Sequence, residues 1–172
     1  MGTRDGQGEF LAVLASCRKV NLDTNAFVYH LRQEPRYGPL MEVLFRMAAE
    51  RRLEIVASAV VQLELLVQPM RRRLLEEAET VLELTEQHPN IRIVDVSRPV
   101  TLAAAAIRGR TRLKVPDAIV LATGAVERCG LTIGNDVDCQ QASLALSNLE
   151  IMAQEALPLP LYVRLGDFAA LA

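Results

Sequence analysis

The fold is decided by a short apolar stretch that runs directly into an acid, Lys19-Val20-Asn21-Leu22-Asp23-Thr24-Asn25. Residues 19–22 predict a short buried strand, and Asp23 marks its carboxyl end. Further strands are predicted at residues 53–57, 91–96 and 131–133, with residues 150–153 as the candidate for a fifth.

In the segments between these strands, apolar residues recur at helical spacing. Helices are predicted at residues 37–51, 59–68, 74–87, 101–110, 116–127 and 141–147. Ser58 is expected to cap the second of these helices, and Pro69 is expected to end it. Strands that alternate with helices favour right-handed βαβ crossovers. The sequence therefore predicts an α/β domain with three layers, α/β/α, around a central parallel sheet of roughly five strands.

The chain has 172 residues, of which 51% are hydrophobic, and this suits one compact domain. We expect that domain to span residues 18–155. Residues 1–17 are expected to be an N-terminal extension, because residues 1–10 are polar and glycine-rich. Residues 156–172 are apolar but interrupted by prolines, so we expect a tail that packs on the outside of the domain or against a partner.

The composition excludes several classes of protein. No apolar run reaches the roughly 18 residues of a membrane-spanning helix, which predicts a soluble protein. Three cysteines without Cys-x-x-Cys spacing exclude a disulfide framework and structural zinc, and favour a reducing, cytoplasmic setting. Neither a glycine-rich nucleotide-binding loop nor a Gly-x-Ser-x-Gly elbow is present. The net charge of −2 does not indicate a nucleic-acid binder, although a sum hides any local basic pattern.

Acidic residues follow two of the predicted strands. Asp23 comes directly after the strand at residues 19–22, and Asp136 lies in the loop after the strand at residues 131–133. In open parallel sheets, ligands bind beyond the carboxyl ends of the strands, where the strand order reverses. If these two strands are neighbours at that point, the two carboxylates face each other across one crevice.

Two further acids are predicted at the same edge. Glu64 lies in the first two turns of the helix after Ser58, and Asp117 lies in the first turn of the helix opened by Pro116. Two like charges about 4 Å apart repel by about 4 kcal/mol at an effective dielectric of about 20, so four such carboxylates need cations. Carboxylate oxygens without histidine or thiolate favour Mg²⁺ or Mn²⁺. A metal-activated water can then attack a phosphodiester.

Each of these residues also has an ordinary structural role open to it. An Asx-turn, a helix N-cap or a favourable helix-dipole position accounts for any single aspartate, including Asp138 beside Asp136. Thr24 and Asn25 either orient the Asp23 carboxylate or a metal-bound water, or cap the following turn. The joint placement of four acids at one edge favours the functional interpretation.

Four blocks of the sequence resemble the PIN-domain family, in particular the VapC-type toxins of toxin–antitoxin pairs. In the family's order, the blocks are Leu22-Asp23-Thr24-Asn25-Ala26, Ser58-Ala59-Val60-Val61-Gln62-Leu63-Glu64, Pro116-Asp117-Ala118-Ile119-Val120-Leu121-Ala122-Thr123 and Asn135-Asp136-Val137-Asp138. The resemblance implies a five-stranded parallel sheet and Mg²⁺- or Mn²⁺-dependent endonucleolytic cleavage of RNA. It places metal binding on Asp23, Glu64, Asp117 and Asp136, with Asp138 as an additional candidate. It also implies a homodimer and a small antitoxin that blocks the acidic pocket.

The sequence departs from the family pattern in two places near the site. Gly134 stands where Ser or Thr is frequent, so a polar contact is expected to be missing there. Cys139 stands where an aromatic residue is common, and both terminal extensions are longer than usual. These departures bear on the toxin assignment more than on the nuclease fold.

Four basic residues lead towards the predicted acidic site: Arg108, Arg110, Arg112 and Lys114. We expect them to contact the phosphate backbone of the substrate. The arginines at residues 71–73 are instead expected to form a solvated helix start, balanced by the glutamates that follow. With aromatic residues at 4%, platforms for base stacking are few, and Tyr29 and Tyr37 are the candidates near the site.

Three functions are compatible with these patterns. The first is a metal-dependent endoribonuclease that acts as the toxin of a VapBC-type pair. The second is a PIN-type nuclease that works in RNA processing or on DNA without an antitoxin. The third is a non-catalytic PIN-fold binding module. Loss of Mn²⁺ binding in an Asp23→Asn variant would separate the first two functions from the third.

Overall fold

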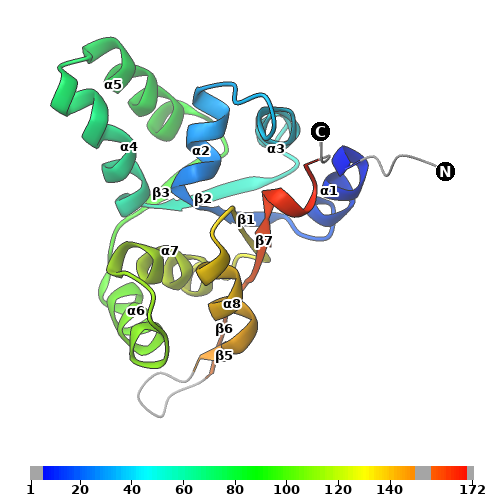
Figure 1. The fold of residues 1–172 in the computed structure, drawn as a ribbon, viewed down its shortest axis with the longest axis vertical. Helices are drawn as coiled ribbons and strands as arrows, with labels where there is room; N and C mark the ends of the chain where they lie inside the picture. The colour runs from blue at the N-terminus through cyan, green and yellow to red at the C-terminus, as the bar shows by residue number, and fades with distance from the viewer. Residues whose placement is uncertain (1–5, 150–155, 170–172) are drawn as a thin grey trace.

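The central feature of the fold is a five-stranded sheet (Figure 1). The computed structural model describes residues 6–149 and 156–169. The strands of the sheet are β1 (Lys19–Leu22), β2 (Glu54–Ser58), β3 (Ile91–Val94), β4 (Leu131–Gly134) and β7 (Leu161–Arg164). They lie in the order β3-β2-β1-β4-β7, and every neighbouring pair is parallel. The predicted parallel α/β fold is confirmed.

Helices cover both faces of this sheet (Figure 1). On one side lie α1 (Gly6–Leu14), α2 (Thr24–Leu31), α3 (Gly38–Ala49), α4 (Ala59–Arg72) and α5 (Leu75–Leu82), which continues into a short π-helix, Glu83–Gln87. On the other side lie α6 (Arg98–Arg110), α7 (Val115–Val126) and α8 (Val137–Ala145). An antiparallel pair, β5 (Asn148–Leu149) and β6 (Leu157–Pro158), and a 3₁₀ turn, Leu165–Asp167, follow. Within the described ranges, each helix is too short or too polar to cross a membrane.

Side chains along each strand alternate between the two faces of the sheet, so each face packs against its own layer of helices. Val20 and Leu22 of β1 are buried in the core shared with α1 to α5. Asn21 lies between them and points the other way, donating from Nδ2 to the Val120 carbonyl of α7 at 3.0 Å. Tyr162 of β7 is buried in the second core, with α6, α7 and α8. Burial of a large apolar side chain contributes about 1.5–3 kcal/mol, so both cores hold the sheet in place.

Helix α4 is longer than the sequence predicted, because Pro69 lies inside it rather than at its end. A proline removes the hydrogen bond that its own N–H would donate, but the buried side of this helix, with Val61, Leu65 and Pro69, keeps the last turn in place. The helix ends instead at Arg73, whose φ of 56° turns the chain while its N–H caps the final carbonyls. The prediction that Pro69 ends this helix is wrong.

Both ends of the described chain take part in the folded core. Phe10 and Leu14 of α1 are fully buried, and the ring of Phe10 lies 5.4 Å from that of Phe168. Residues 161–164 pair with β4 as the edge strand of the sheet, where the sequence predicted a tail packing outside it. Pro160 precedes this strand and so removes no hydrogen bond from its ladder. The strand predicted at residues 150–153 lies outside the described residues.

Candidate active site

The site forms where the strand order reverses. β1 lies between β2 and β4, so the chain leaves β1 towards one edge and returns on its other side. Leu22 pairs with Ile133, and the N–H of Asp23 donates to the Ile133 carbonyl at 2.9 Å. Asp23 and the loop that carries Asp136 therefore follow adjacent strands, which is the condition that the sequence analysis set for these two acids to share one crevice.

Asp23 is more enclosed than the other three acids, with 8% of its surface exposed. It caps α2, and its Oδ1 accepts a hydrogen bond from the N–H of Thr24 at 2.7 Å. Burial raises the pKa of its carboxyl from 3.8 to about 6, and the carboxylates of Asp117 and Asp136 act in the same direction. Hydrogen bonds from Tyr162 and Thr24 oppose this rise in pKa. The environment therefore favours binding of a proton or a cation by this carboxylate.

The surroundings of Asp117 also raise the pKa of its carboxyl. Asp117 lies in the first turn of α7, and burial raises the pKa of its carboxyl, followed by the effects of Asp136 and Glu64. The positive charge of Lys114 opposes that rise in pKa. Repulsion thus links Asp117 to Asp136 and Glu64, and Asp23 to two of these three. Such a set of carboxylate oxygens suits a hard divalent cation, whose charge relieves the repulsion.

The four acids are not already gathered around one point. In residues 6–149 and 156–169, no group of three or more His, Cys, Asp or Glu side chains has the spacing of a metal site. Protein donors hold several of the carboxylates instead: the Thr24 hydroxyl donates to Glu64, and the Cys139 N–H donates to Asp136 at 2.8 Å. Each of these donors holds one oxygen of its carboxylate, Oε2 of Glu64 and Oδ1 of Asp136.

Thr24 and Asn25 both contact the acids. Thr24 donates its N–H to Asp23 and its hydroxyl to Glu64, so it joins two acids from different helices. The Nδ2 of Asn25 donates to Oδ2 of Asp23 at 3.4 Å. The Oδ1 of Asn25 is buried and has no hydrogen-bond partner within the described part of the chain. Both residues are therefore placed to orient the Asp23 carboxylate, and they also form the first turn of α2.

Asp136 and Asp138 differ in their surroundings. The Asp136 carboxylate caps α8, which is why this helix begins at Val137 rather than at residue 141 as predicted. Asp138 is exposed in the first turn of the same helix and lines a surface hollow together with Arg112. The structure brings Asp136 together with Asp23 and Asp117, and it places Asp138 in an exposed hollow that Arg112 also lines.

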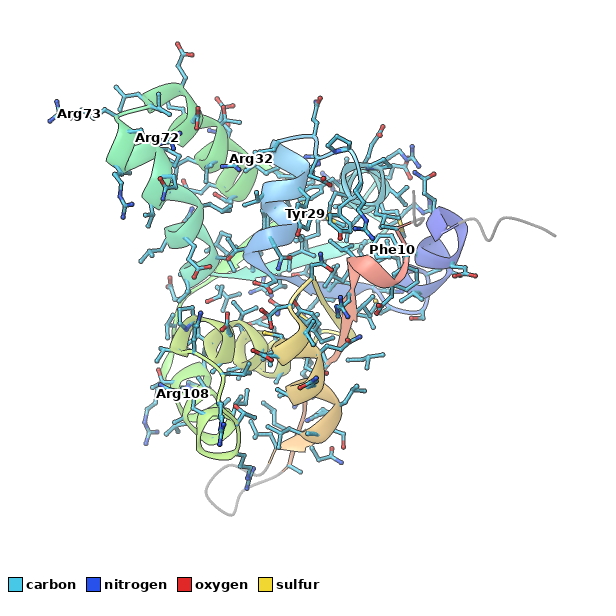
Figure 2. The ribbon with its side chains drawn as sticks, viewed as in Figure 1. Phe10, Tyr29, Arg32, Arg72, Arg73 and Arg108 are labelled. Atoms are coloured by element: carbon cyan, nitrogen blue, oxygen red, sulfur yellow. The ribbon has the colours of Figure 1, made fainter. Side chains whose placement is uncertain are left out.

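The four basic residues predicted to contact substrate are exposed. Arg108 and Arg110 belong to the last turn of α6, and Figure 2 shows Arg108 on the outside of that helix. Arg112 lies in the connection to α7, and Lys114 is the N-cap residue of α7. Because its charge lowers the pKa of Asp117, Lys114 lies at the acidic edge.

A second basic group lies beside Glu64, and the sequence did not indicate it. Arg32, at the C-cap of α2, and Arg72, in the last turn of α4, line one groove together with Glu64. Both arginines are labelled in Figure 2, where they lie towards the α4–α5 end of the molecule. Arg72 belongs to the triplet that was expected at a helix start and instead ends α4. Only the packing of α2 beside α4 brings the two arginines into one groove.

Tyr162 is the site residue that sequence reasoning missed. It lies on β7, and its hydroxyl donates to Oδ2 of Asp23 at 2.7 Å. Burial raises the pKa of this phenol, and the negative charge of Asp23 raises it further, so the hydroxyl stays protonated. The polar contact that was expected to be missing at Gly134 is thus supplied by another strand. No sequence signal marked it, because the segment was expected to pack outside the sheet.

The parallel sheet and its acidic edge have counterparts among known proteins. A profile of the PIN domain matches residues 20–145, which is more than half of the chain. The chain belongs to the PIN domain family, whose members are typically metal-dependent nucleases and commonly use divalent metals. A comparison with curated proteins found no match.

Among solved structures, the chain is similar to VapBC2 from Rickettsia felis bound to a promoter DNA fragment, with 17% identity, a TM-score of 0.59, and coverage of 72% of this chain and 92% of that one. It is also similar to DNA-bound VapBC from Salmonella typhimurium, with 14% identity, a TM-score of 0.58, and coverage of 86% and 98%. A third is VapC20 from Mycobacterium tuberculosis, a sarcin-ricin loop cleaving toxin, with 16% identity, a TM-score of 0.57, and coverage of 72% and 94%. At these identities the likeness shows the fold.

Proposed function

We propose that this chain is an endoribonuclease that depends on a divalent metal and is the toxin of a VapBC-type pair. The observation that carries the proposal is the mutual repulsion of Asp23, Asp117 and Asp136 beyond the carboxyl ends of β1 and β4. Neighbouring acids that raise the pKa of Asp23 and of Asp117 destabilise the fold unless protons or cations occupy the site. A bound divalent cation would relieve this repulsion, and the relief would add to the free energy of metal binding.

The proposed ligands of Mg²⁺ or Mn²⁺ are Asp23, Glu64, Asp117 and Asp136. When bound, the ion supplies charge compensation and an activated water for attack at phosphorus. Asp23 is the anchor of the set, because burial and hydrogen bonds to both of its oxygens restrict its side chain. Thr24 ties Glu64 to this anchor through its hydroxyl.

Asn25 is proposed to orient water at the site. Its Nδ2 holds Asp23, while its buried Oδ1 lacks a partner in the described residues. A buried amide oxygen without a partner costs about 1–3 kcal/mol, and a water that donates to it removes that cost. Such a water would lie beside the Asp23 carboxylate.

The proposed substrate is RNA, bound by cations on two sides of the acids. Lys114 lies on the α7 side, and Arg32 and Arg72 line the groove beside Glu64. Arg108, Arg110 and Arg112, which are exposed between the end of α6 and α7, are proposed to extend this basic surface. Contacts to phosphate release counterions, so binding is expected to weaken steeply as the salt concentration rises.

The proposed partners are a second copy of the chain and a small antitoxin. Helix α4 and the start of α5 expose five large apolar side chains, between 37% and 69% of their surface: Leu63, Val67, Met70, Leu74 and Leu75. Exposed apolar surface of this kind commonly marks a protein interface. Solved neighbours of the fold include a toxin–antitoxin complex from Klebsiella pneumoniae.

Metal-dependent digestion of a defined RNA pool, with mapped cut sites, tests the proposal. We expect cleavage by the wild type in Mg²⁺ or Mn²⁺, no cleavage in EDTA, and no cleavage by Asp23→Asn. Asp95→Asn is the matched control, because Asp95 directly follows β3 at the same edge of the sheet but is exposed. This variant should cut at the wild-type rate.

The other functions correspond to other outcomes of this test. Cleavage of DNA in place of RNA would support a PIN-type nuclease without the toxin role. Failure of the wild type to bind Mn²⁺ in calorimetry would support a non-catalytic binding module. Either result would overturn the proposal.

A further inference from the structure

The hydroxyl of Tyr162 joins two segments of the proposed metal site that are far apart in the chain. It donates to Oδ2 of Asp23 at 2.7 Å and accepts from the N–H of Asp136 at 3.1 Å. One bond holds a carboxylate after β1, and the other holds the loop after β4. The residue is 1% exposed, so water does not compete for these bonds.

Gly134 leaves the space that this hydroxyl occupies. A Cβ atom at Gly134 would lie 2.0 Å from the hydroxyl oxygen of Tyr162 and 2.8 Å from Cβ of Asp23. Among the described residues, no glycine has a positive φ, so this glycine is not needed for an unusual backbone conformation. Space for Tyr162 is therefore the reason that the structure gives for a glycine at this position.

The backbone of Tyr162 is itself fixed by a buried serine. Its N–H donates to Oγ of Ser143 at 2.9 Å, and that Oγ donates to the Pro160 carbonyl at 2.9 Å. In the sheet, Tyr162 pairs with Thr132 of β4, two residues before Gly134. The ring thus reaches from a rigid strand to the carboxyl edge.

We infer that Tyr162 is a positioning residue, whose hydroxyl fixes the Asp23 carboxylate and the Asp136 loop relative to each other in the space left by Gly134. The inference rests on the proposed function, in which both aspartates hold the metal. Groups that orient metal ligands typically change metal affinity by 10–100-fold when they are removed. Without the hydroxyl, Asp23 loses one of its donors, and the loop N–H loses its acceptor.

Calorimetric titration of Mn²⁺ into the full chain, without RNA, tests this inference. In Tyr162→Phe, which removes only the hydroxyl, we expect the Kd for Mn²⁺ to rise at least about tenfold. At saturating Mn²⁺, cleavage should recover most of its rate, and the KM for RNA should stay at its wild-type value. Thr85→Val is the matched control: it removes an equally buried hydroxyl, whose hydrogen bonds go to Gln62 and to the Val81 carbonyl rather than to a carboxylate, so its Kd should stay within about twofold of wild type.

The outcomes separate the inference from the proposed function. If the wild type binds no Mn²⁺, the proposed function fails. If the wild type binds Mn²⁺ and Tyr162→Phe binds it equally well, or if Thr85→Val loses as much affinity, the positioning role of Tyr162 fails while the proposed function stands.

The space that Gly134 leaves for the Tyr162 hydroxyl can be tested separately. Gly134→Ala should lower Tm more in the wild type than in Tyr162→Phe, because the nearest clashing atom is the hydroxyl oxygen. Equal losses of Tm in the two backgrounds would contradict the idea that Gly134 makes room for this hydroxyl.

Discussion

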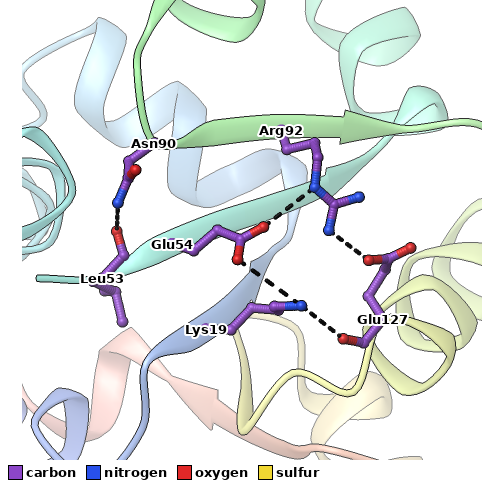
Figure 3. Close-up of polar contacts among 6 residues, drawn as sticks. All are labelled: Lys19, Leu53, Glu54, Asn90, Arg92 and Glu127. Atoms are coloured by element: carbon purple, nitrogen blue, oxygen red, sulfur yellow. Dashed lines mark hydrogen bonds and ion pairs between the residues drawn. The ribbon is translucent and has the colours of Figure 1, made fainter. Parts of the chain in front are cut away.

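The two ends of the central sheet carry acids in opposite surroundings. At the amino ends of the strands, each acid faces a base (Figure 3). Arg92 lies 3.2 Å from Glu54 and 2.5 Å from Glu127, and Lys19 lies 3.9 Å from Glu54. Lys19 also donates to the backbone carbonyl of Glu127 at 3.2 Å. These charges are balanced within the protein.

At the carboxyl ends, acids face acids. Asp117 and Asp136 raise the pKa of Asp23 together with its burial, and Lys114 is the base that opposes the rise at Asp117. The first arrangement is complete without any other molecule, whereas we propose that the second gains stability from an added cation. Imbalance of charge at one end of the sheet therefore separates the proposed functional acids from the structural ones.

The largest effect is expected for Asp117→Asn. We predict that it reduces cleavage at least about 100-fold, because it removes a proposed metal ligand. Its Tm without metal should be unchanged or higher, since the change relieves repulsion with Asp136 and Glu64. Cleavage assays and thermal melts in EDTA measure the two effects. A marked drop of Tm in EDTA would place Asp117 with the structural acids instead.

The pKa of Asp23 predicts the pH dependence of stability without metal. Its folded pKa of about 6 lies above the ordinary 3.8, so the folded protein holds a proton that the unfolded chain releases. The stability from Asp23 is therefore fully present below pH 3.8 and is lost as the pH rises through about 6. Two pKa units correspond to about 3 kcal/mol.

Urea unfolding between pH 4 and pH 7 measures this loss. Asp23→Asn should remove the Asp23 part of it, and saturating Mn²⁺ should remove it in the wild type, because the cation stabilises the ionised form. A wild-type profile that matches Asp23→Asn in EDTA would show that this end of the sheet is as balanced as the other.

Much of the fold could be predicted because strand and helix periods are local. Residues 19–22 form a strand as predicted, and Ser58 caps α4 as predicted. The errors arise where tertiary packing overrides a local signal. Pro69 stays helical because it is buried, and residues 161–164 join the sheet although prolines precede them.

The part of the site that depends on the order of the strands could be predicted from the sequence. The part that depends on a side chain from a distant strand could not. The adjacency of β1 and β4 follows from the reversal of strand order, which brings Asp23 close to Asp136. The contact of Tyr162 with Asp23 depends on which strand takes the edge position next to β4. The residues around Tyr162 in the sequence do not indicate which strand takes this edge position.

A smaller effect is expected at the balanced end of the sheet. Glu54→Gln removes the carboxylate that pairs with Arg92 and Lys19. Because these side chains are between 32% and 46% exposed, the loss of stability should be at most about 1 kcal/mol and should shrink in high salt. Mn²⁺ affinity should not change. Denaturant melts at low and high salt, with calorimetry on the same variant, measure both.

The smallest effect is expected for Asp138→Asn. The family resemblance offers Asp138 as an additional ligand, yet the structure places it on the surface beside Arg112. Because none of the four proposed ligands lines this hollow, Mn²⁺ affinity and cleavage rate should stay within about twofold of wild type, well short of the 10–100-fold losses typical of groups that serve a metal site. If Asp138→Asn instead weakened Mn²⁺ binding as strongly as Asp117→Asn, this exposed acid would also belong to the metal site. The difference in charge balance between the two ends of the sheet would then no longer distinguish functional acids from structural ones.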